Sequence, residues 1–472
     1  MEATKQQPRR CAPPIFHLPS PISVPSPVVP WSRSPARRAP RPALCALRLA
    51  LCALRLAPCA FVALLLGSAT AGRAQDALRM SMASAEAAEG RRKAATTIGY
   101  YNLHVGPTAW RFGAGLGLQF NDNVNLSQNN PQSDLALTPQ INTEMLWPIT
   151  DKNAINLTVG VGYSAYVEHP ELDRIFVAPG TELSFDLYVG DFWFNFHDRI
   201  SITQNAYQDP TVTGTGSYSQ LQNALGASAL WDLNKVILRS GYDHVNYLAL
   251  AGSGGQPNGQ SELFSASAGY ALRPGAQLGI ELGGGLLHYS GASTTFTDAS
   301  QWSAGCFYET QLSQYIHCRG SVGYTVYSPE APGSLPVVPG SSRVLGDFSG
   351  IYAQLDVAHR LNAKLDYTLS GGRSINFGLF GGAVDMYFAR LAANWNLLRK
   401  FALGTTFSYE HGSQLNTGTE TFDRFGPGLT LGHTITSKLS GSLGYQYYWR
   451  GSSLPGREYT ANIVSLNFSY RF

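Results

Sequence analysis

Long apolar runs are missing from the sequence beyond residue 75, where no stretch is apolar for long enough to form a membrane helix. Charged residues are also scarce, at 14% of the 472 residues, against 44% hydrophobic residues. Glycine and tyrosine, in contrast, are abundant, with 49 and 24 residues. Dispersed apolar residues, many small and aromatic residues and little charge are typical of all-β proteins, membrane barrels among them.

A basic surplus is also missing from most of the chain. The formal net charge of +3 comes from residues 1–74, which hold ten Lys and Arg residues and a single acidic residue, Glu2. The rest of the chain carries 24 basic and 30 acidic side chains. It offers no basic patch of the kind that binds nucleic acid, so we expect no nucleic-acid partner.

Residues 1–74 have the features of an export signal rather than of a folded domain. Basic residues precede a short apolar core, and small residues follow it in SATAGRAQD. This pattern defines a secretory signal peptide, so we expect Sec-type export with cleavage after Ala71 or Ala74. The unusual length of the signal favours a true translation start downstream of Met1. Residues 75–108 are then a partly disordered periplasmic lead-in.

A period-two alternation of apolar and polar residues recurs from residue 109 to the C-terminus. It is clear in FWFNFHDRISI (192–202) and in the last nine residues, VSLNFSYRF. Such alternation predicts strands with one apolar face. The strands run to about ten residues, longer than the usual five or six and long enough for a tilted strand to cross a bilayer.

Short turns and long polar connections alternate along the chain, as in outer-membrane barrels with short periplasmic turns and long extracellular loops. Short turns are predicted at 148–153, 232–235, 273–276, 397–400 and 434–438, and long loops at 121–134, 206–219, 250–260 and 328–347. Counting the long loops gives about nine hairpins. We therefore expect a single antiparallel up-and-down barrel of about 18 strands (16–18) over residues 109–472. Because backbone groups in lipid must all be hydrogen-bonded, the last strand should close against the first, near 109–120.

Three tryptophans, Trp147, Trp231 and Trp395, each lie just before a predicted short turn. Indole rings at that position are typical of the aromatic belt at a membrane interface. Packing at the ends of hairpins is the alternative interpretation.

The C-terminal strand resembles the recognition sequence of bacterial outer-membrane proteins that is read by the β-barrel assembly machinery. The residues that carry this resemblance are Val464, Leu466, Phe468, Tyr470 and Phe472. GLQFNDNVNLSQNNPQSDLALTPQI (117–141) and GVGYSAYVEHPELD (160–173) are similar to the opening hairpins of outer-membrane porins of the beta-barrel porin 2 type. The resemblance implies a porin-like barrel in the outer membrane, in contact with its lipid.

Motifs for catalysis or metal binding are scarce. The ten histidines are scattered, and no pair has the spacing of metal ligands. No serine stands out as a nucleophile, although a barrel could assemble a triad in space. We expect no enzyme, no cofactor and no metal. One alternative is a calcium site at Asp122, Asn123 and Asp134, against a solvated loop of turn-forming residues.

The polar faces of the strands carry charges of both signs. The predicted lumen charges are Arg111, Glu144, Arg199, Arg239, Asp243, Glu281, Arg319, Asp356, Asp366, Arg390, Glu410, Arg450 and Arg471. Mixed charges suit a water-filled pore with weak selectivity, or a network that stiffens the wall. We expect a passive channel for small polar solutes, with a non-channel barrel of structural, polysaccharide- or secretion-associated role as the alternative.

Only two cysteines, Cys306 and Cys318, follow the signal region. A hairpin turn about Leu312 would place them directly opposite each other, with both side chains on the apolar face. A disulfide fits only the closer type of opposed pair, and the oxidising compartment permits it. Two free thiols on a lipid-facing surface are the alternative.

Overall fold

The computed structural model describes residues 101–203, 207, 212–215, 219–250, 258–290, 298–330, 347–377, 383–414 and 420–472. All of them belong to one of two compact units, residues 58–472; the other is residues 1–57. The predicted signal peptide and most of the predicted lead-in lie outside the described residues. Among the described residues, no helix has the length and apolar character that crossing a membrane requires.

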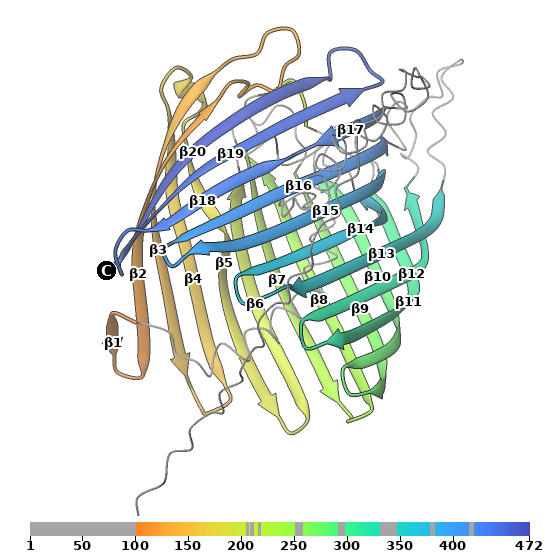
Figure 1. Cartoon of the computed structure of the whole chain (residues 1–472). Helices are drawn as coiled ribbons and strands as arrows, with labels where there is room; N and C mark the ends of the chain where they lie inside the picture. Colours follow the sequence, from red (N-terminus) through yellow and green to blue (C-terminus); the bar gives the residue numbers. More distant parts are fainter. Residues whose placement is uncertain are drawn as a thin grey trace, which may run out of the picture. The chain divides into compact units, whose positions relative to one another are not determined.

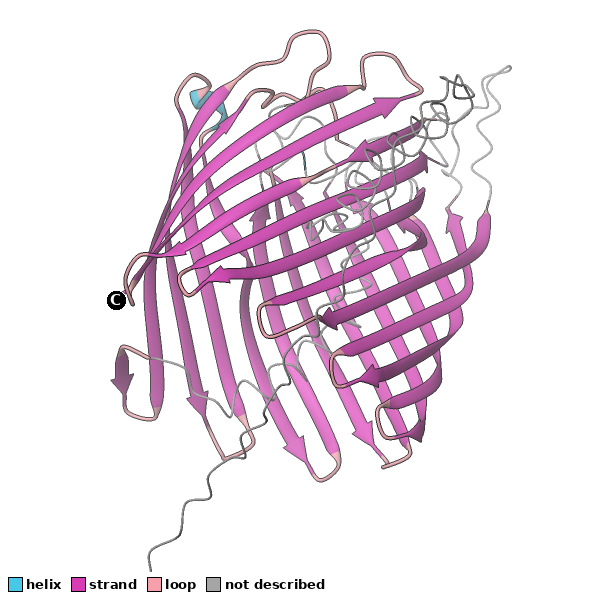
Figure 2. Cartoon of the chain, in the orientation of Figure 1, coloured by secondary structure: helices cyan, strands magenta, loops and turns pink. Residues whose placement is uncertain are grey.

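Antiparallel strands make up nearly all of the described structure, as Figure 2 shows in magenta. They are β1 (Leu103–Val105), β2 (Thr108–Asn121), β3 (Asp134–Pro148), β4 (Ala154–Tyr166), β5 (Arg174–Val189), β6 (Phe192–Thr203), β7 (Gln220–Asp232), β8 (Val236–Ala249), β9 (Asn258–Arg273), β10 (Ala276–Ser290), β11 (Ala299–Ser313), β12 (Ile316–Pro329), β13 (Phe348–Arg360), β14 (Leu365–Phe377), β15 (Ala383–Leu398), β16 (Phe401–Gln414), β17 (Thr421–Phe425), β18 (Gly428–Thr434), β19 (Leu439–Ser452) and β20 (Tyr459–Arg471). A 3-10 turn, η1 (Pro170–Leu172), lies between β4 and β5.

The strands form one closed barrel wall that is eighteen strands around, and each strand pairs with its neighbours in sequence (Figure 1). β17 and β18 both pair with β16 and β19, so they are two halves of one wall strand, which is interrupted at Gly426 and Pro427. β1 forms a short hairpin with the start of β2 and is not counted as a separate strand of the wall. The predicted fold class and strand number are confirmed.

The barrel closes by pairing of its first wall strand, β2, with its last, β20, as predicted. β20 pairs with β19 on one side and with β2 on the other, from Gly113 opposite Arg471 to Asn121 opposite Ile463. No strand is left to fray at the C-terminus, because Phe472 itself donates a backbone hydrogen bond to Phe112. β2 begins at Thr108.

Connections of two kinds separate the strands. The strand bounds leave eight short turns of two to five residues that join strands at one end of the barrel, and nine connections of five to eighteen residues that join them at the other. All five predicted short turns are present. The predicted long connections at 206–219, 250–260 and 328–347 lie largely outside the described residues.

The two faces of the wall differ in polarity. Exposed apolar side chains such as Leu116, Ile141 and Leu282 follow the predicted alternation along one face. The opposite face is the concave, inner one: there the Tyr352 hydroxyl of β13 reaches Glu281 of β10, three strands away, at 2.9 Å. The barrel is thus apolar outside and polar inside, the reverse of a soluble domain with a single core.

Candidate channel interior and rims

The alternation places all thirteen predicted lumen charges on the inner face. Six of the predicted residues form three pairs within the set: Arg111 with Glu144, Arg319 with Glu281 and Arg390 with Glu410. The last two pairs have N···O distances of 3.0 and 3.1 Å. These inner charges are therefore mostly neutralised in pairs along the wall.

Other members of the set pair with residues that the sequence analysis did not select as partners. Arg199 lies 3.2 Å from Glu182, and Arg450 lies 2.7 Å from Glu420. Asp243 accepts a 2.6 Å hydrogen bond from His197.

The remaining four predicted lumen residues lie apart from these pairs. Asp366 accepts a hydrogen bond of 3.3 Å from Asn394, and Asp356 contacts Gln354. Arg239 lies on β8 opposite Leu230, and Arg471 lies on β20 opposite Gly113.

Register explains most of the missed partners. Glu182 lies directly opposite Arg199, Glu309 opposite Arg319, and Arg424 opposite Glu410. Counting outward from the β5–β6 turn would have found the first, whereas the bulge between Gln311 and Ser313 shifts the second by one position. Glu420 lies in a connection, where strand register gives no guidance.

A cluster of side chains around Arg319 lies on the inner face between β10 and β13. The Arg319 guanidinium contacts Glu281 and Glu309, at 3.0 and 3.3 Å, and stacks over the Phe307 ring at 4.5 Å. Glycine makes room for it: a Cβ at Gly305 would lie 2.2 Å from the Tyr352 hydroxyl. Small residues here let the inner side chains interdigitate at a tight bend.

A directed hydrogen-bond chain crosses the inner faces of β5 to β8. Asn195 donates its amide to Asp186 at 2.8 Å, which leaves its carbonyl oxygen facing His197 Nδ1 at 2.9 Å. The other ring nitrogen of His197 faces the carboxylate of Asp243. Both nitrogens of His197 therefore face acceptors, and a Cβ at Gly226 would collide with this contact.

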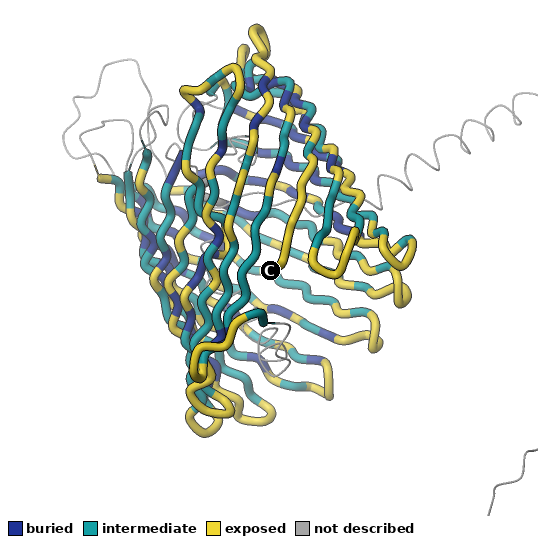
Figure 3. Tube along the Cα trace, turned by 90° about the vertical axis from the view of Figure 1, so that its left-hand side faces the viewer, coloured by how far each residue is buried: buried dark blue, intermediate teal, exposed yellow. Residues whose placement is uncertain are grey.

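Water access to the inner face differs between the two ends. Near the short turns the inner side chains of Asp366, Asn394 and Asn467 are exposed. Near the long connections, the inner charges Glu410 and Arg450 are fully buried. Figure 3 shows buried and exposed positions alternating along the strands and exposed turns at their ends. At the short-turn end, exposed inner positions therefore lie beside a buried inner cluster of Trp193 and Leu230, whereas the inner charges Glu410 and Arg450 near the long connections have no exposed surface.

Inward-folded connections account for this packing. Leu126, from the connection after β2, and Val212, from the connection after β6, are both buried. They form an apolar cluster with Tyr448, Tyr459, Ala461 and Ile463 on the wall. The Gly214 N–H also donates to the Leu126 carbonyl at 3.0 Å. Two connections thus meet each other and the wall inside the barrel.

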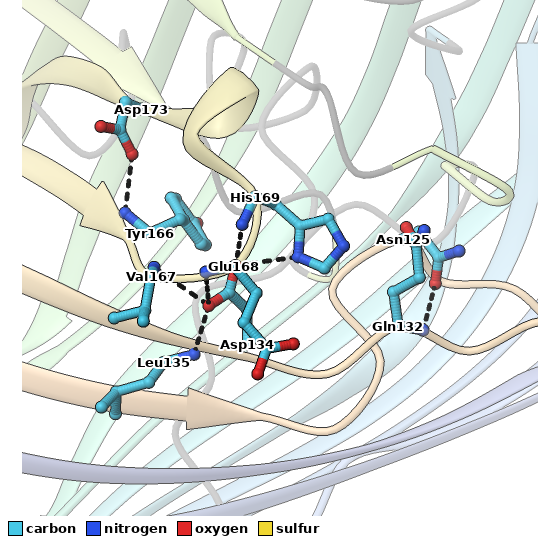
Figure 4. A network of polar contacts seen from close by, with 9 residues as sticks. All are labelled: Asn125, Gln132, Asp134, Leu135, Tyr166, Val167, Glu168, His169 and Asp173. Carbon is cyan, nitrogen blue, oxygen red and sulfur yellow. Dashed lines mark hydrogen bonds and ion pairs between the residues drawn. The ribbon is translucent and has the colours of Figure 1, made fainter.

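Asp134 organises the base of the neighbouring connections, as Figure 4 shows. Its carboxylate accepts backbone N–H groups of Leu135, Val167, Glu168 and His169, and it contacts the His169 ring at 2.9 Å. These contacts tie the start of β3 to the turn that precedes η1. From the sequence alone, Asp134 was a candidate only for an oxygen ligand of calcium.

The three residues of the calcium alternative are directed to separate protein donors. Asp122 accepts the backbone and side-chain N–H groups of Asn462, each at 2.6 Å. Asn123 accepts from Ser127 N and donates to the Thr460 carbonyl. Within the described ranges no group of three or more His, Cys, Asp or Glu residues is placed to hold a metal ion. The calcium alternative is therefore not supported by this geometry.

Aromatic side chains mark both ends of the outer face. Trp147, Trp231 and Trp395 are exposed next to the short turns, as predicted. Toward the long connections, outward tyrosines bond to polar groups: Tyr163 to Asp173, Tyr242 to Glu262 and Tyr409 to Asp423. This second belt was missed, because its carboxylate partners lie on other strands and connections.

Cys306 and Cys318 share the outer face, as expected, and of the two alternatives the structure has the two free thiols. Cys306 lies opposite Val322 and Cys318 opposite Thr310, because the hairpin turns at Gln314 and Tyr315 rather than at Leu312. Both thiols are free, and both belong to the outer face. A bulge between Gln311 and Ser313 accompanies the displaced turn.

No protein-family model matches the sequence, and no curated protein matches it. Solved outer-membrane proteins resemble the fold at low identity. The outer membrane protein OpdK from Pseudomonas aeruginosa has 10% identity and a TM-score of 0.44, with 77% of this chain and 99% of that chain covered. A BenF-like porin from Pseudomonas fluorescens Pf-5 has 11% identity and a TM-score of 0.43, with 77% and 99% covered. OccAB3 from Acinetobacter baumannii has 10% identity and a TM-score of 0.43, with 78% and 100% covered.

Proposed function

We propose that the protein is an outer-membrane barrel that acts as a passive, porin-like channel for small polar solutes. The observation that carries the proposal is the inner wall, which is lined by polar and charged groups and accessible to water near the short turns. A closed wall of eighteen strands is wide enough for an aqueous channel. Paired charges on its inner face favour weak selectivity over strong attraction of one ion type.

The outer face supports the membrane location. Its apolar side chains are exposed, and aromatic residues flank them at both ends. On β15, Trp395 and Tyr387 lie eight residues apart, about 26 Å of strand. A tilted strand of that length spans most of an apolar band about 25 Å tall. In this orientation the short turns are periplasmic and the long connections extracellular.

The C-terminal residues support assembly in the outer membrane. Val464, Leu466, Phe468, Tyr470 and Phe472 all lie on the outer face and are exposed. They form the alternating strand that the assembly machinery would recognise, and the strand they belong to completes the wall. The proposal therefore includes lipid and the assembly machinery as partners.

A non-channel barrel is the second candidate, and one observation favours it. The cluster of Leu126 and Val212 with the wall packs the interior near the long connections. A full plug at this level would leave a structural or secretion-associated role.

Liposome swelling separates the two functions. Refolded protein in liposomes should admit small neutral sugars and exclude large oligosaccharides. Entry of none of these solutes, with a correctly folded barrel, would favour the non-channel role.

A further inference from the structure

An apolar hollow interrupts the outer face of the wall on β9 to β12. It has a volume of about 450 Å³, within the range of about 300–1,000 Å³ that is usual for ligand pockets. Two small residues, Ala266 on β9 and Ala304 on β11, leave the space. Larger apolar side chains surround it: Phe264, Leu282, Trp302 and Tyr324. Trp302 and Tyr324 are 52% and 51% exposed, so the hollow opens outward.

A glycine on β10 gives the hollow one of its sides. Gly284 lies directly opposite Trp302 in the β10–β11 register. A Cβ at Gly284 would lie 2.4 Å from Cζ3 of the Trp302 ring. The indole ring therefore lies against the wall at Gly284, where any other residue would displace it, and it borders the hollow from there.

The hollow lies in the half of the apolar band that is nearer the long connections. On β9 the outward residues Tyr270 and Glu262 are eight positions apart, the same spacing as Trp395 and Tyr387 on β15. Phe264, which borders the hollow, is only two positions from Glu262, about 7 Å along the strand. One end of the hollow is therefore next to the polar edge of the outer face.

Polar side chains gather at this edge on β8, β9 and β10. Glu262 accepts a 2.6 Å hydrogen bond from the Tyr242 hydroxyl and contacts His244 Nδ1 at 2.8 Å. On β10, His288 contacts the carboxylate of Asp298. We call these five residues the polar rim. Apolar hollow and polar rim thus follow each other along the same strands.

The polar rim has two carboxylates and no lysine or arginine beside them. Residues 240–272 and 274–318 contain neither of these basic residues. Each carboxylate is in contact with one histidine, but an ionised carboxylate has about four acceptor positions and can take further donors. A bare phosphate would be repelled here, whereas an ammonium or a hydroxyl group would find acceptors.

We propose that the hollow binds an acyl chain of a membrane lipid and that the polar rim binds the head of the same molecule through its ammonium or hydroxyl groups. The hollow is continuous with the lipid-facing surface of the barrel, and the rim begins where the apolar face ends. A lipid presents a chain and a polar head in this order along its length. This inference rests on the membrane location and does not require an open channel.

Native mass spectrometry of the protein, purified from outer membranes in detergent, tests the site. The protein is incubated with phosphatidylethanolamine, whose head carries an ammonium group, or with phosphatidic acid that has the same acyl chains. Ala266→Trp and Ala304→Phe each fill the hollow, from β9 and from β11. Ala389→Trp, at an exposed outer-face alanine of β15, is the matched control. Heat-modifiable migration establishes that each variant is folded.

The wild type and Ala389→Trp should each retain one phosphatidylethanolamine per barrel and about tenfold less phosphatidic acid, as one hydrogen bond to a charged group would give. Ala266→Trp and Ala304→Phe should lose about tenfold or more of the bound phosphatidylethanolamine, because several methylene groups lose their contacts. Glu262→Gln should keep the chain site and reduce the preference between the two lipids.

Equal retention of lipid by the wild type, Ala266→Trp and Ala304→Phe would overturn the chain site. Equal retention of the two lipids by the wild type would overturn the role of the polar rim. A lipid-free dimer of the wild type that becomes monomeric in Ala266→Trp would show that a second copy fills the hollow, and would overturn the lipid site. If one of the two filled variants does not fold, the other decides. The channel is tested separately by conductance, so failure of the lipid site leaves it standing.

Discussion

The backbone N–H of Phe472 donates to the carbonyl of Phe112 at 3.2 Å, and the N–H of Phe112 donates to the Asn102 side chain at 3.1 Å. Phe112 is therefore the residue at which β2 changes partner. After Phe112, from Gly113 to Asn121, β2 pairs with β20, and before it, from Thr108 to Trp110, β2 pairs with β1. Phe472 therefore contributes a backbone hydrogen bond to the seam between β20 and β2.

Deleting Phe472 should impair assembly, because it removes the last seam hydrogen bond and the outward ring that packs against Tyr470 at 5.3 Å. Leu466→Arg should act similarly, since a basic residue on a lipid face costs about 2–4 kcal/mol near the midplane. The inner-face change Asn467→Asp is the matched control. Semi-native gels report the heat-modifiable barrel; normal yield in the deletion variant would contradict this role.

Tags inserted at the two ends of the barrel should behave differently. An epitope within residues 330–342 should be tolerated and labelled on intact cells. The same epitope in Asp232–Lys235 should stay hidden and reduce folding, because this tight turn fixes the register of β7 and β8. Surface labelling at Asp232–Lys235 would reverse the proposed topology.

Gly226→Ala should destabilise the barrel. The added Cβ would lie 2.3 Å from Asp243 Oδ1 and 2.6 Å from His197 Nε2, so the buried contact between them must break. Loss of a buried polar contact costs about 1–3 kcal/mol. At Gly404 the nearest atom lies 3.7 Å from an added Cβ, so Gly404→Ala is the control. Equal thermal midpoints for the two variants would refute the role of Gly226.

Asp134→Ala should loosen the turn before η1 and leave the wall intact. The change removes the acceptor of four backbone N–H groups, three of them in residues 167–169. Each N–H left without a partner costs about 1–3 kcal/mol if it stays buried, so the segment should open to solvent. Limited proteolysis should cut the variant near residues 167–173. Cleavage at the same rate in the wild type would argue against the bracing role.

Cys306 and Cys318 should both react with an alkylating reagent in denatured, unreduced protein. In the β11–β12 register the two residues are displaced by four positions, about 13 Å along the strands. A disulfide needs Cα atoms within about 7 Å. In protein without residues 1–74, which hold the other four cysteines, the mass should therefore increase by two alkyl groups, and an unmodified protein would show that the register is different.

The fold was largely predictable from the sequence because a barrel wall repeats one rule. In 192–202 the alternation alone identified the outward phenylalanines and the inward Asn195, His197 and Arg199. The turns at 232–235 and 273–276 were predictable from their polar, turn-forming residues. The position of each strand in the wall follows from its own apolar–polar alternation and from the two connections at its ends.

Contacts between side chains were only partly predictable. A shift of the β11–β12 turn from Leu312 to Gln314 and Tyr315 was enough to separate Cys306 from Cys318. Arg424 and Tyr207, which are in contact, lie 217 positions apart in the sequence, and nothing in the local sequence indicates this contact. Contacts of inward connections depend on the closed shape of the wall, which no single segment encodes.

Conductance in planar lipid bilayers tests the channel most directly. Purified, heat-modifiable protein added to the bilayer should produce discrete current steps, with weak preference between cations and anions because the inner charges are paired. Empty detergent and heat-denatured protein are the controls. A folded barrel that inserts into the bilayer and gives no current steps would contradict the proposed channel.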